Sequence, residues 1–409
     1  MVGPFLPDAD KLVAVREALP ALGAGIYLNA GSVGPLPAET AAAMAQQAER
    51  ELTAGRAHQA DLDDALERLA EARAGVAALL GTDTAAVALT HGTTDAMNAA
   101  LTAIDWRPGD RVVTTTHEHP AALGPLAAIR GRYGVEVVAV DLPEDGDPQG
   151  TLAALDPVVT PRTRLVAVSH VSFMSGAVLP VARIGDLAHG RGALFVVDGA
   201  QAAGAIPVRF EDTGADMYAL PAQKWLLGPE AMGALVVPPD VAQRLTPAFG
   251  GYFSFETLSP DAATWWPDAR RFEWTFFHRP SVVGMARSLG WLAMFVGWEF
   301  VHRRGPEAAR AMADRLAAIP GVTIITPRDH MATLVTFRIA GWDPERALEE
   351  LGSRVFAIAR TIKALDALRV SVGFYSSVDE LERFAASVEL LAAHTPDTLP
   401  ARRPLAVLG

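Results

Sequence analysis

Short runs of apolar residues alternate with segments of helical periodicity over the first two thirds of the chain. The runs are rich in valine and alternate only weakly with polar residues, which is typical of strands buried on both faces of a sheet. Because helical segments such as residues 93–104 and 180–192 separate the runs, the pattern predicts an α/β fold with a mostly parallel sheet. The predicted strands are residues 86–90, 111–116, 135–140, 164–172, 193–199, 216–220 and 233–237.

The pattern changes after about residue 290, where longer helical segments appear with predicted strands at residues 332–340 and 368–376. The 409 residues exceed the roughly 250 to 300 residues that one core usually supports, so more than one domain is expected. The predicted parts are an N-terminal segment that contributes to the small domain or the active site, residues 1–30, a large domain, residues 31–290, and a smaller C-terminal α/β domain, residues 291–409.

Composition and charge narrow the classes of protein. The chain is 50% hydrophobic and 20% charged, as a folded globular protein is. Its net charge of −12 and the lack of a long basic tract argue against a nucleic-acid partner. The apolar segment 290–301 is shorter than the about 20 residues that cross a bilayer, so a buried helix is expected there. No secretion signal opens the chain, and a cytoplasmic protein without a membrane partner is expected.

The chain contains no cysteine. This excludes disulfides, thiolate metal sites and a cysteine nucleophile together. We expect no metal site.

Polar residues follow several predicted strands. A Gly-Thr-Thr turn with Thr93 and Thr94 opens a helix after the first strand, and such a turn offers backbone N–H groups and hydroxyls to a phosphate. Asp198 lies at the end of another strand, and Lys224 lies in an apolar segment after the next. Each has a simpler explanation as a helix cap, a turn residue or a surface lysine. Together they are expected to face one crevice, because open α/β sheets bind ligands at the carboxyl ends of strands.

Seven segments carry a resemblance to a known family. They are IYLNAGSVGPLP (26–37), HGTTDAMN (91–98), THEHPAAL (116–123), VSHVSFMSGAVLPV (168–181), VDGAQAAGAIPV (197–208), QKWLLGPEAMGAL (223–235) and LRVSVGFYSSVDEL (368–381). The chain resembles the fold-type I pyridoxal-phosphate enzymes of the class V aminotransferase group, which includes cysteine desulfurases, C–S lyases and isopenicillin-N-epimerase-like proteins. The resemblance implies pyridoxal 5′-phosphate as cofactor, an amino-acid substrate and a homodimer with shared active sites.

The resemblance also assigns roles at the cofactor. Lys224 matches the lysine that binds the cofactor covalently, which requires a neutral amine, and an apolar environment favours that form. Asp198 matches the acid that pairs with the pyridine nitrogen, and Gln201 matches the amide that hydrogen-bonds the phenolic oxygen. His119 matches the histidine that stacks on the ring and moves protons. Lys224, His119 and Asp198 are therefore the predicted catalytic residues.

Further matches concern the substrate and the phosphate. Arg369 matches the arginine that holds the α-carboxylate through two parallel hydrogen bonds. Asn29 and Ser32 match a loop near the substrate, although a plain polar turn explains them almost as well. Several positions depart from the family pattern. Pro221 stands where relatives often have serine, and residues 270–280 lack the usual Gly-Thr pair. Gln223 stands where relatives often have histidine and is expected to contact the phosphate, and Phe173 stands where many have asparagine.

The missing cysteine also bears on the reaction. Cysteine desulfurases carry sulfur as a persulfide on a mobile cysteine, which this chain does not have. We therefore expect C–S bond cleavage by β-elimination, with Lys224 or His119 removing the Cα proton. Epimerisation, transamination and decarboxylation stay open, because substrate placement chooses the bond that breaks.

Two readings from other classes of protein fit less well. A nicotinamide dehydrogenase would need a G-x-G-x-x-G turn after the first strand, and a catalytically inactive scaffold of the same fold would not need Lys224, Asp198 and Arg369 together. Residues 264–280, rich in aromatic side chains and arginine, are the expected exchanged segment of the homodimer, although an ordinary aromatic surface loop explains them equally well.

Overall fold

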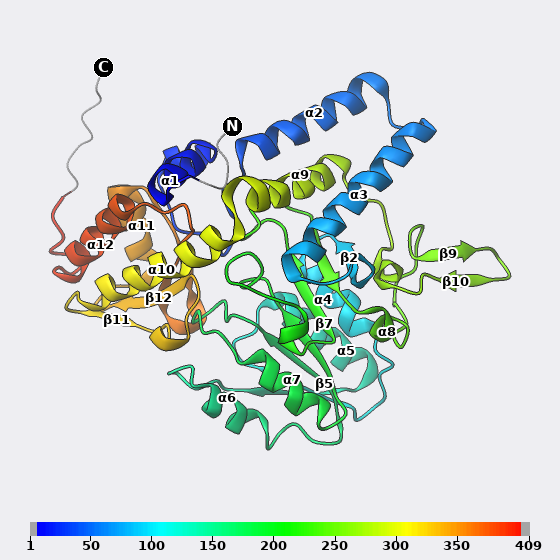
Figure 1. Ribbon diagram of the computed structural model, residues 1–409. Helices are drawn as coiled ribbons and strands as arrows, with labels where there is room; N and C mark the ends of the chain where they lie inside the picture. Colours follow the sequence, from blue (N-terminus) through cyan, green and yellow to red (C-terminus); the bar gives the residue numbers. More distant parts are fainter. Residues whose placement is uncertain (1–5, 402–409) are drawn as a thin grey trace.

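A seven-stranded sheet, here called the large sheet, forms the centre of the computed structural model, which describes residues 6–401 (Figure 1). Its strand order is β2-β8-β7-β6-β5-β3-β4, and β8 alone runs against its neighbours. The mostly parallel α/β sheet expected from the sequence is confirmed, and every predicted run overlaps one strand. The strands are β2 (Val87–Thr90), β3 (Arg111–Thr115), β4 (Glu136–Val140), β5 (Thr163–Ser169), β6 (Leu194–Asp198), β7 (Met217–Pro221) and β8 (Gly233–Val236).

Helices cover both faces of the large sheet (Figure 1). Successive side chains of a strand point to opposite faces. In β6, Val196 accordingly belongs to the core formed with α4 and α5, whereas Phe195 and Val197 belong to the core formed with α3 and α7. Burial on both faces explains the continuous apolar runs of the sequence. The helices are α3 (Gln59–Leu80), α4 (Thr93–Thr102), α5 (Pro120–Tyr133), α6 (Pro148–Leu155) and α7 (Val181–His189).

A second sheet, here called the small sheet, is antiparallel with strand order β11-β12-β15-β14. Its core, which includes Phe337 and Phe384, also contains Ile26 and Leu28 from the start of the chain. These residues reach it because β1 (Ile26–Tyr27) pairs with β13 (Ala357–Ile358). The other elements here are α10 (Trp298–Ala317), β11 (Val322–Ile324), β12 (Leu334–Ile339), α11 (Pro344–Val355), β14 (Arg360–Ile362), β15 (Ala367–Ser371) and α12 (Val378–Ala392).

The connection between the two sheets differs from the expected buried helix at residues 290–301. Helix α9 (Arg279–Gly290) continues into a π-helical turn, Trp291–Val296, and then stops at Gly297, whose φ of 85° breaks the helix before α10. Met294 in this turn is 76% exposed, so the segment is buried only in part. No helix within residues 6–401 is long and apolar enough to cross a membrane.

The remaining elements lie at the periphery of the molecule. The hairpin β9–β10 projects from the body, and α2 and α3 stand out together beside α9 (Figure 1). These elements are α1 (Asp8–Glu17), α2 (Ala38–Ala54), α8 (Pro239–Ala242), β9 (Phe255–Leu258) and β10 (Ala263–Trp265).

Candidate active site

The carboxyl edge of the large sheet carries four of the predicted site residues. Thr93 is the first residue of α4, directly after β2, and His119 caps the start of α5, after β3. Asp198 is the last residue of β6, and Lys224 follows the end of β7. Parallel strands bring these ends to one edge of the sheet, as the sequence led us to expect.

The N-terminal loop after β1 covers the lysine. The Gly34 backbone N–H donates to the Gln223 carbonyl oxygen at 2.7 Å. A Cβ atom at Gly34 would lie 2.3 Å from the Lys224 carbonyl oxygen, so only glycine allows this approach. Leu227, at the end of the same turn, has a backbone φ of 51°, a value that residues other than glycine rarely adopt. The lysine therefore lies on a tightly bent and clamped loop.

Burial and charge together favour a neutral Lys224. Burial is the largest influence and lowers the pKa of Lys224 to about 8, assisted by the positive charges of Arg369 and Arg360 and opposed by Asp198. Near neutral pH, a larger fraction of Lys224 is then a free amine than for an ordinary exposed lysine.

Asp198 and Gln201 lie beside the lysine, and both are buried. Burial raises the pKa of Asp198, while the charge of Lys224 and a 2.9 Å hydrogen bond from the Ala200 N–H act in the opposite direction. Gln201 donates from Nε2 to the Gly31 carbonyl oxygen at 2.8 Å and accepts at Oε1 from the Trp225 indole N–H at 3.0 Å. Its amide is therefore held in one orientation.

The His119 ring is oriented by two contacts. Its Nδ1 accepts a hydrogen bond from the Ala121 N–H at 3.1 Å, so the proton of the neutral ring is assigned to Nε2. Phe173 meets the ring edge to face, with 4.9 Å between the centroids. Burial, followed by the charges of Lys224, Arg360 and Arg369, lowers the pKa of His119 to about 4. The imidazole is therefore neutral near pH 7.

Arg369 is fully buried on β15, and the small sheet thus supplies a guanidinium to the site. Its Nη1 donates to the Phe173 carbonyl oxygen at 2.6 Å, while Nε and Nη2 have no hydrogen-bond partner within residues 6–401. Burial, followed by the charge of Arg360, lowers the pKa of Arg369 to about 9. Unpaired guanidinium N–H groups in a buried place fit a carboxylate ligand.

Two further residues of the candidate active site, Arg360 and Phe173, were not predicted as site residues from the sequence. Arg360, opposite Arg369 in the β14–β15 pair, donates from Nη1 to the Ser32 hydroxyl at 3.2 Å. Ser32 in turn donates to Asn29 Oδ1 at 2.8 Å, which links both predicted loop residues to this arginine. Phe173 was noted only as a departure from the family, yet it contacts His119 through its ring and Arg369 through its carbonyl. An arginine between apolar residues in FAIARTI was the available signal for Arg360.

The polar groups at the large sheet fit pyridoxal phosphate. The Thr93 hydroxyl is buried without a hydrogen-bond partner in the described part of the chain, and it lies at a helix start that suits an anion. The side-chain oxygen of Gln223 is also buried without a partner there, so this amide can turn its NH2 group toward a phosphate. Thr94, the other predicted threonine, has an exposed side chain. Asp198 suits a protonated ring nitrogen, and the Lys224 amine suits an aldehyde. When bound, the cofactor supplies an electron sink for a carbanion at Cα.

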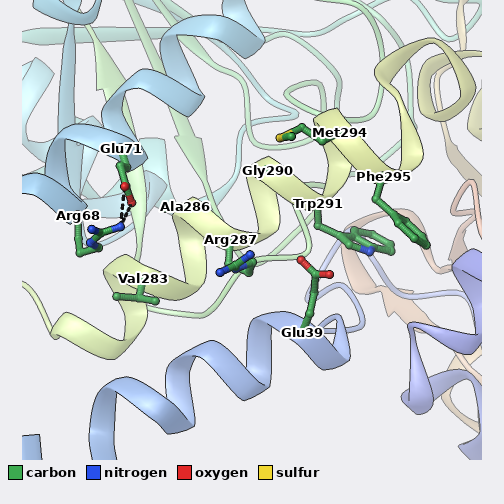
Figure 2. Close-up of a pocket in the computed structure, with 10 residues that line it drawn as sticks. All are labelled: Glu39, Arg68, Glu71, Val283, Ala286, Arg287, Gly290, Trp291, Met294 and Phe295. Carbon is green, nitrogen blue, oxygen red and sulfur yellow. Dashed lines mark hydrogen bonds and ion pairs between the residues drawn. The ribbon is translucent and has the colours of Figure 1, made fainter. Parts of the chain in front are cut away.

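A separate cavity of about 800 Å³ lies between α2, α3 and α9, away from these residues (Figure 2). Arg68 and Glu71 form an ion pair across 2.5 Å on one of its walls, and Trp291 and Phe295 form another wall. None of its lining residues belongs to the predicted site. The residues that line it are Glu39, Arg68, Glu71, Val283, Ala286, Arg287, Gly290, Trp291, Met294 and Phe295.

Known proteins show similarity over almost the whole chain. The model of the family described as aminotransferase class-V matches residues 26–384. A probable cysteine desulfurase of Methanothermobacter thermautotrophicus is 28% identical over 92% of this chain and 97% of its own length. An isopenicillin N epimerase of Streptomyces clavuligerus is 30% identical over 90% of this chain and 94% of its own length.

Solved structures share the fold. The cystine C–S lyase C-DES, in complex with its reaction product cysteine persulfide, superimposes with a TM-score of 0.83 at 24% identity and covers 91% of this chain and 99% of its own. The chain thus has the fold of pyridoxal-phosphate-dependent enzymes. The protein belongs to the aminotransferase class-V family, and is a pyridoxal-phosphate-dependent enzyme that acts on an amino acid.

Proposed function

We propose that the protein cleaves the C–S bond of a sulfur-substituted amino acid by β-elimination and releases the sulfur product directly, without forming a persulfide on the protein. The observation that carries the proposal is a site with three features: a buried lysine whose pKa is lowered to about 8, a buried arginine with two nitrogen atoms that have no hydrogen-bond partner within residues 6–401, and no cysteine anywhere in the chain. Relatives named cysteine desulfurases support C–S chemistry.

The hydrogen bonds of His119 leave the removal of the Cα proton to Lys224. His119 accepts at Nδ1 and carries its proton on Nε2, so it donates a hydrogen bond to the site and is not the base. The Lys224 amine then removes the Cα proton, and the Cβ–S bond breaks as the thiol departs. With one water, the remaining fragment yields pyruvate and ammonia when the substrate is a cysteine thioether.

The two arginines define the substrate. Arg369 holds the α-carboxylate, because its Nε and Nη2 atoms are buried and have no hydrogen-bond partner within residues 6–401. Arg360 makes no ion pair with a carboxylate within the described residues, and its charge acts on Lys224, His119 and Arg369. A second anionic group on the substrate would stabilise this arrangement. A disulfide or thioether amino acid with two carboxylates, such as cystine, fits best.

Epimerisation is the second candidate function. The relative named isopenicillin N epimerase, at 30% identity, favours it. The same Lys224 amine would remove the Cα proton, and a proton would return to Cα from the other face. Transamination and decarboxylation use the same residues, and no specific observation favours them.

We also propose a homodimer with shared active sites. An aromatic patch, formed by Phe249, Tyr252, Trp274 and Phe276, is exposed to solvent on one chain. His91 lies between the patch and the phosphate site, because its ring is 6.1 Å from that of Trp274 and its chain position precedes Thr93. A second copy on this patch would cover apolar surface and approach the cofactor, as the family resemblance implies.

The reaction is tested with a panel of amino acids on the holoenzyme. Cystine, cysteine thioethers, cysteine and alanine are incubated with the enzyme, and thiol or persulfide, pyruvate, ammonia, carbon dioxide and loss of Cα deuterium are measured. Equal amounts of sulfur product, pyruvate and ammonia from cystine or a thioether support β-elimination. Deuterium loss without these products would instead support epimerisation, and carbon dioxide would support decarboxylation.

A further inference from the structure

A buried carboxyl group that the proposed reaction does not use lies directly before His119. Glu118 is 3% exposed and lies in the loop between β3 and α5. Its Oε1 atom accepts hydrogen bonds from the Thr115 hydroxyl at 2.6 Å and from the Ser169 N–H at 3.1 Å. Its Oε2 atom accepts from the Ser169 hydroxyl at 2.6 Å. Both carboxyl oxygens are therefore held by the ends of two strands.

These partners connect the two sides of the site. Thr115 is the last residue of β3, and Ser169 is the last residue of β5. Ser169 lies opposite Asp198 in the parallel β5–β6 pair. One carboxyl group thus joins the loop that carries His119 to the strand pair that carries Asp198.

We propose that Glu118 is a positioning residue that sets the place of the His119 ring relative to Asp198 and Lys224. The inference rests on His119 and Asp198 facing one cofactor, and not on C–S cleavage. It applies equally to elimination, epimerisation and transamination, since each requires the same spacing between these groups.

A carboxyl group is better suited to this place than an amide. Three donors converge on its two oxygens, and one end of an amide is itself a donor. The pKa of Glu118 is raised to about 7, mainly by burial. The three hydrogen bonds act in the opposite direction and lower the pKa, whereas the negative charge of Asp198 raises it further. Asp198 in turn interacts with Lys224. An apolar side chain could fill this space without burying an acid, so packing alone does not explain a glutamate.

The test uses protein without cofactor, so that its outcome does not depend on any reaction. The variants are Glu118→Ala, Glu118→Gln and Ser169→Ala, with Asp141→Asn as the matched control. Asp141 also accepts a hydrogen bond from a hydroxyl, that of Thr116 at 2.8 Å, but this pair is exposed and does not involve β5. The readout is the pKa of His119, followed by NMR of its ring nitrogens and assigned with His119→Gln.

Burial holds the pKa of His119 at about 4 in the parent protein. In Glu118→Ala the loop loosens and water reaches the ring, so we expect the pKa to rise by at least about one unit toward the ordinary value. Glu118→Gln and Ser169→Ala should show smaller rises, and Asp141→Asn none. In the holoenzyme, circular dichroism of the cofactor band should weaken in the same order. The value of kcat should fall about 10- to 100-fold in Glu118→Ala, with KM unchanged.

An unchanged His119 pKa and an unchanged cofactor band in both Glu118 variants would overturn the proposal, even if thermal stability fell. An equal change in Asp141→Asn would do the same. If Glu118→Ala does not fold, Glu118→Gln and Ser169→Ala decide the question, because each retains part of the hydrogen-bond set. Failure of C–S cleavage in the substrate panel would leave this result untouched.

Discussion

At the residue scale, the charges of two nearby arginines act on Lys224 and shape its chemistry. Arg369 and Arg360 both favour the neutral amine, whereas Asp198 favours the charged one. The same arginines, with burial, keep His119 neutral. A negatively charged substrate that pairs with the arginines would weaken their effect on both groups, so substrate binding itself would raise the basicity of Lys224.

The capture of pyridoxal phosphate by cofactor-free protein should depend on pH. Only the neutral amine attacks an aldehyde, so the rate should increase with pH around a midpoint near 8, the pKa of Lys224. Absorbance of the bound cofactor measures this rate. The chain has three lysines, so borohydride reduction and peptide mass mapping can assign the site, with Lys363→Ala as an exposed control. Label on Lys11 or Lys363 would refute the assignment.

Replacement of Arg369 should weaken substrate binding. Arg369→Ala removes charge-assisted hydrogen bonds worth about 1.5 to 3 kcal/mol, so KM should rise about 10- to 150-fold. Arg369→Lys should lie between, because lysine keeps the charge and loses the planar fork. Loss of the arginine charge should also raise the midpoint of cofactor capture above pH 8. Steady-state kinetics with the best substrate measures the change in KM. An unchanged KM would contradict the proposal that Arg369 binds the α-carboxylate.

At the scale of elements, loops after strands build the site, and the N-terminal loop closes over them. This loop contacts Gln201 through the Gly31 carbonyl and the lysine turn through the Gly34 N–H. The loop is clamped onto the lysine turn because the backbone at Gly34 closely approaches the backbone at Gln223 and Lys224. The N-terminal loop therefore belongs to the candidate active site, although it lies far from Gln201 and Lys224 in the sequence.

Gly34→Ala should disturb the lysine turn. The added Cβ atom would lie 2.3 Å from the Lys224 carbonyl oxygen, and overpacking of this kind typically costs about 1 to 3 kcal/mol. We expect a lower melting temperature and faster loss of cofactor on dialysis. Gly23→Ala is the control, because a Cβ atom there has no neighbour within 4 Å. Equal melting temperatures and equal cofactor retention in the two variants would contradict the clamp.

At the scale of the whole molecule, the two sheets meet at the site. The large sheet contributes Lys224, Asp198 and His119, while the small sheet contributes Arg369 and Arg360. The groups that we propose for the cofactor and for the substrate thus come from different parts of the molecule. A change in the relative position of the sheets would alter which Cα bond is oriented for cleavage.

The aromatic patch should hold two copies together. Phe276 is 58% exposed, and Phe276→Asp would place a charge within the proposed interface. We expect the variant to become monomeric in light scattering after size-exclusion chromatography, and to retain less cofactor. Val378→Asp is the control, because this residue is also exposed but lies at the start of α12. A parent protein that is monomeric, or a Phe276→Asp dimer, would reject this interface.

The sequence alone determined the strands of the large sheet and the residues at their ends. Strands buried on both faces need continuous apolar runs, so this signal is local and readable. Asp198, His119 and Lys224 were predicted because short motifs around them resemble a family, and the structure brings them to one edge. The start of α4 at Thr93 was likewise readable from its Gly-Thr-Thr turn.

Only the tertiary structure decided which of these groups interact and in which ionisation state. The pKa values of Lys224 and His119 depend on burial and on arginines more than 100 residues away in the chain. Arg360, Phe173 and the partners of Glu118 are likewise defined by contacts between separate strands and loops. Local periodicity records which face of an element is buried, but not the polar group it meets there, because that partner comes from folding of the whole chain.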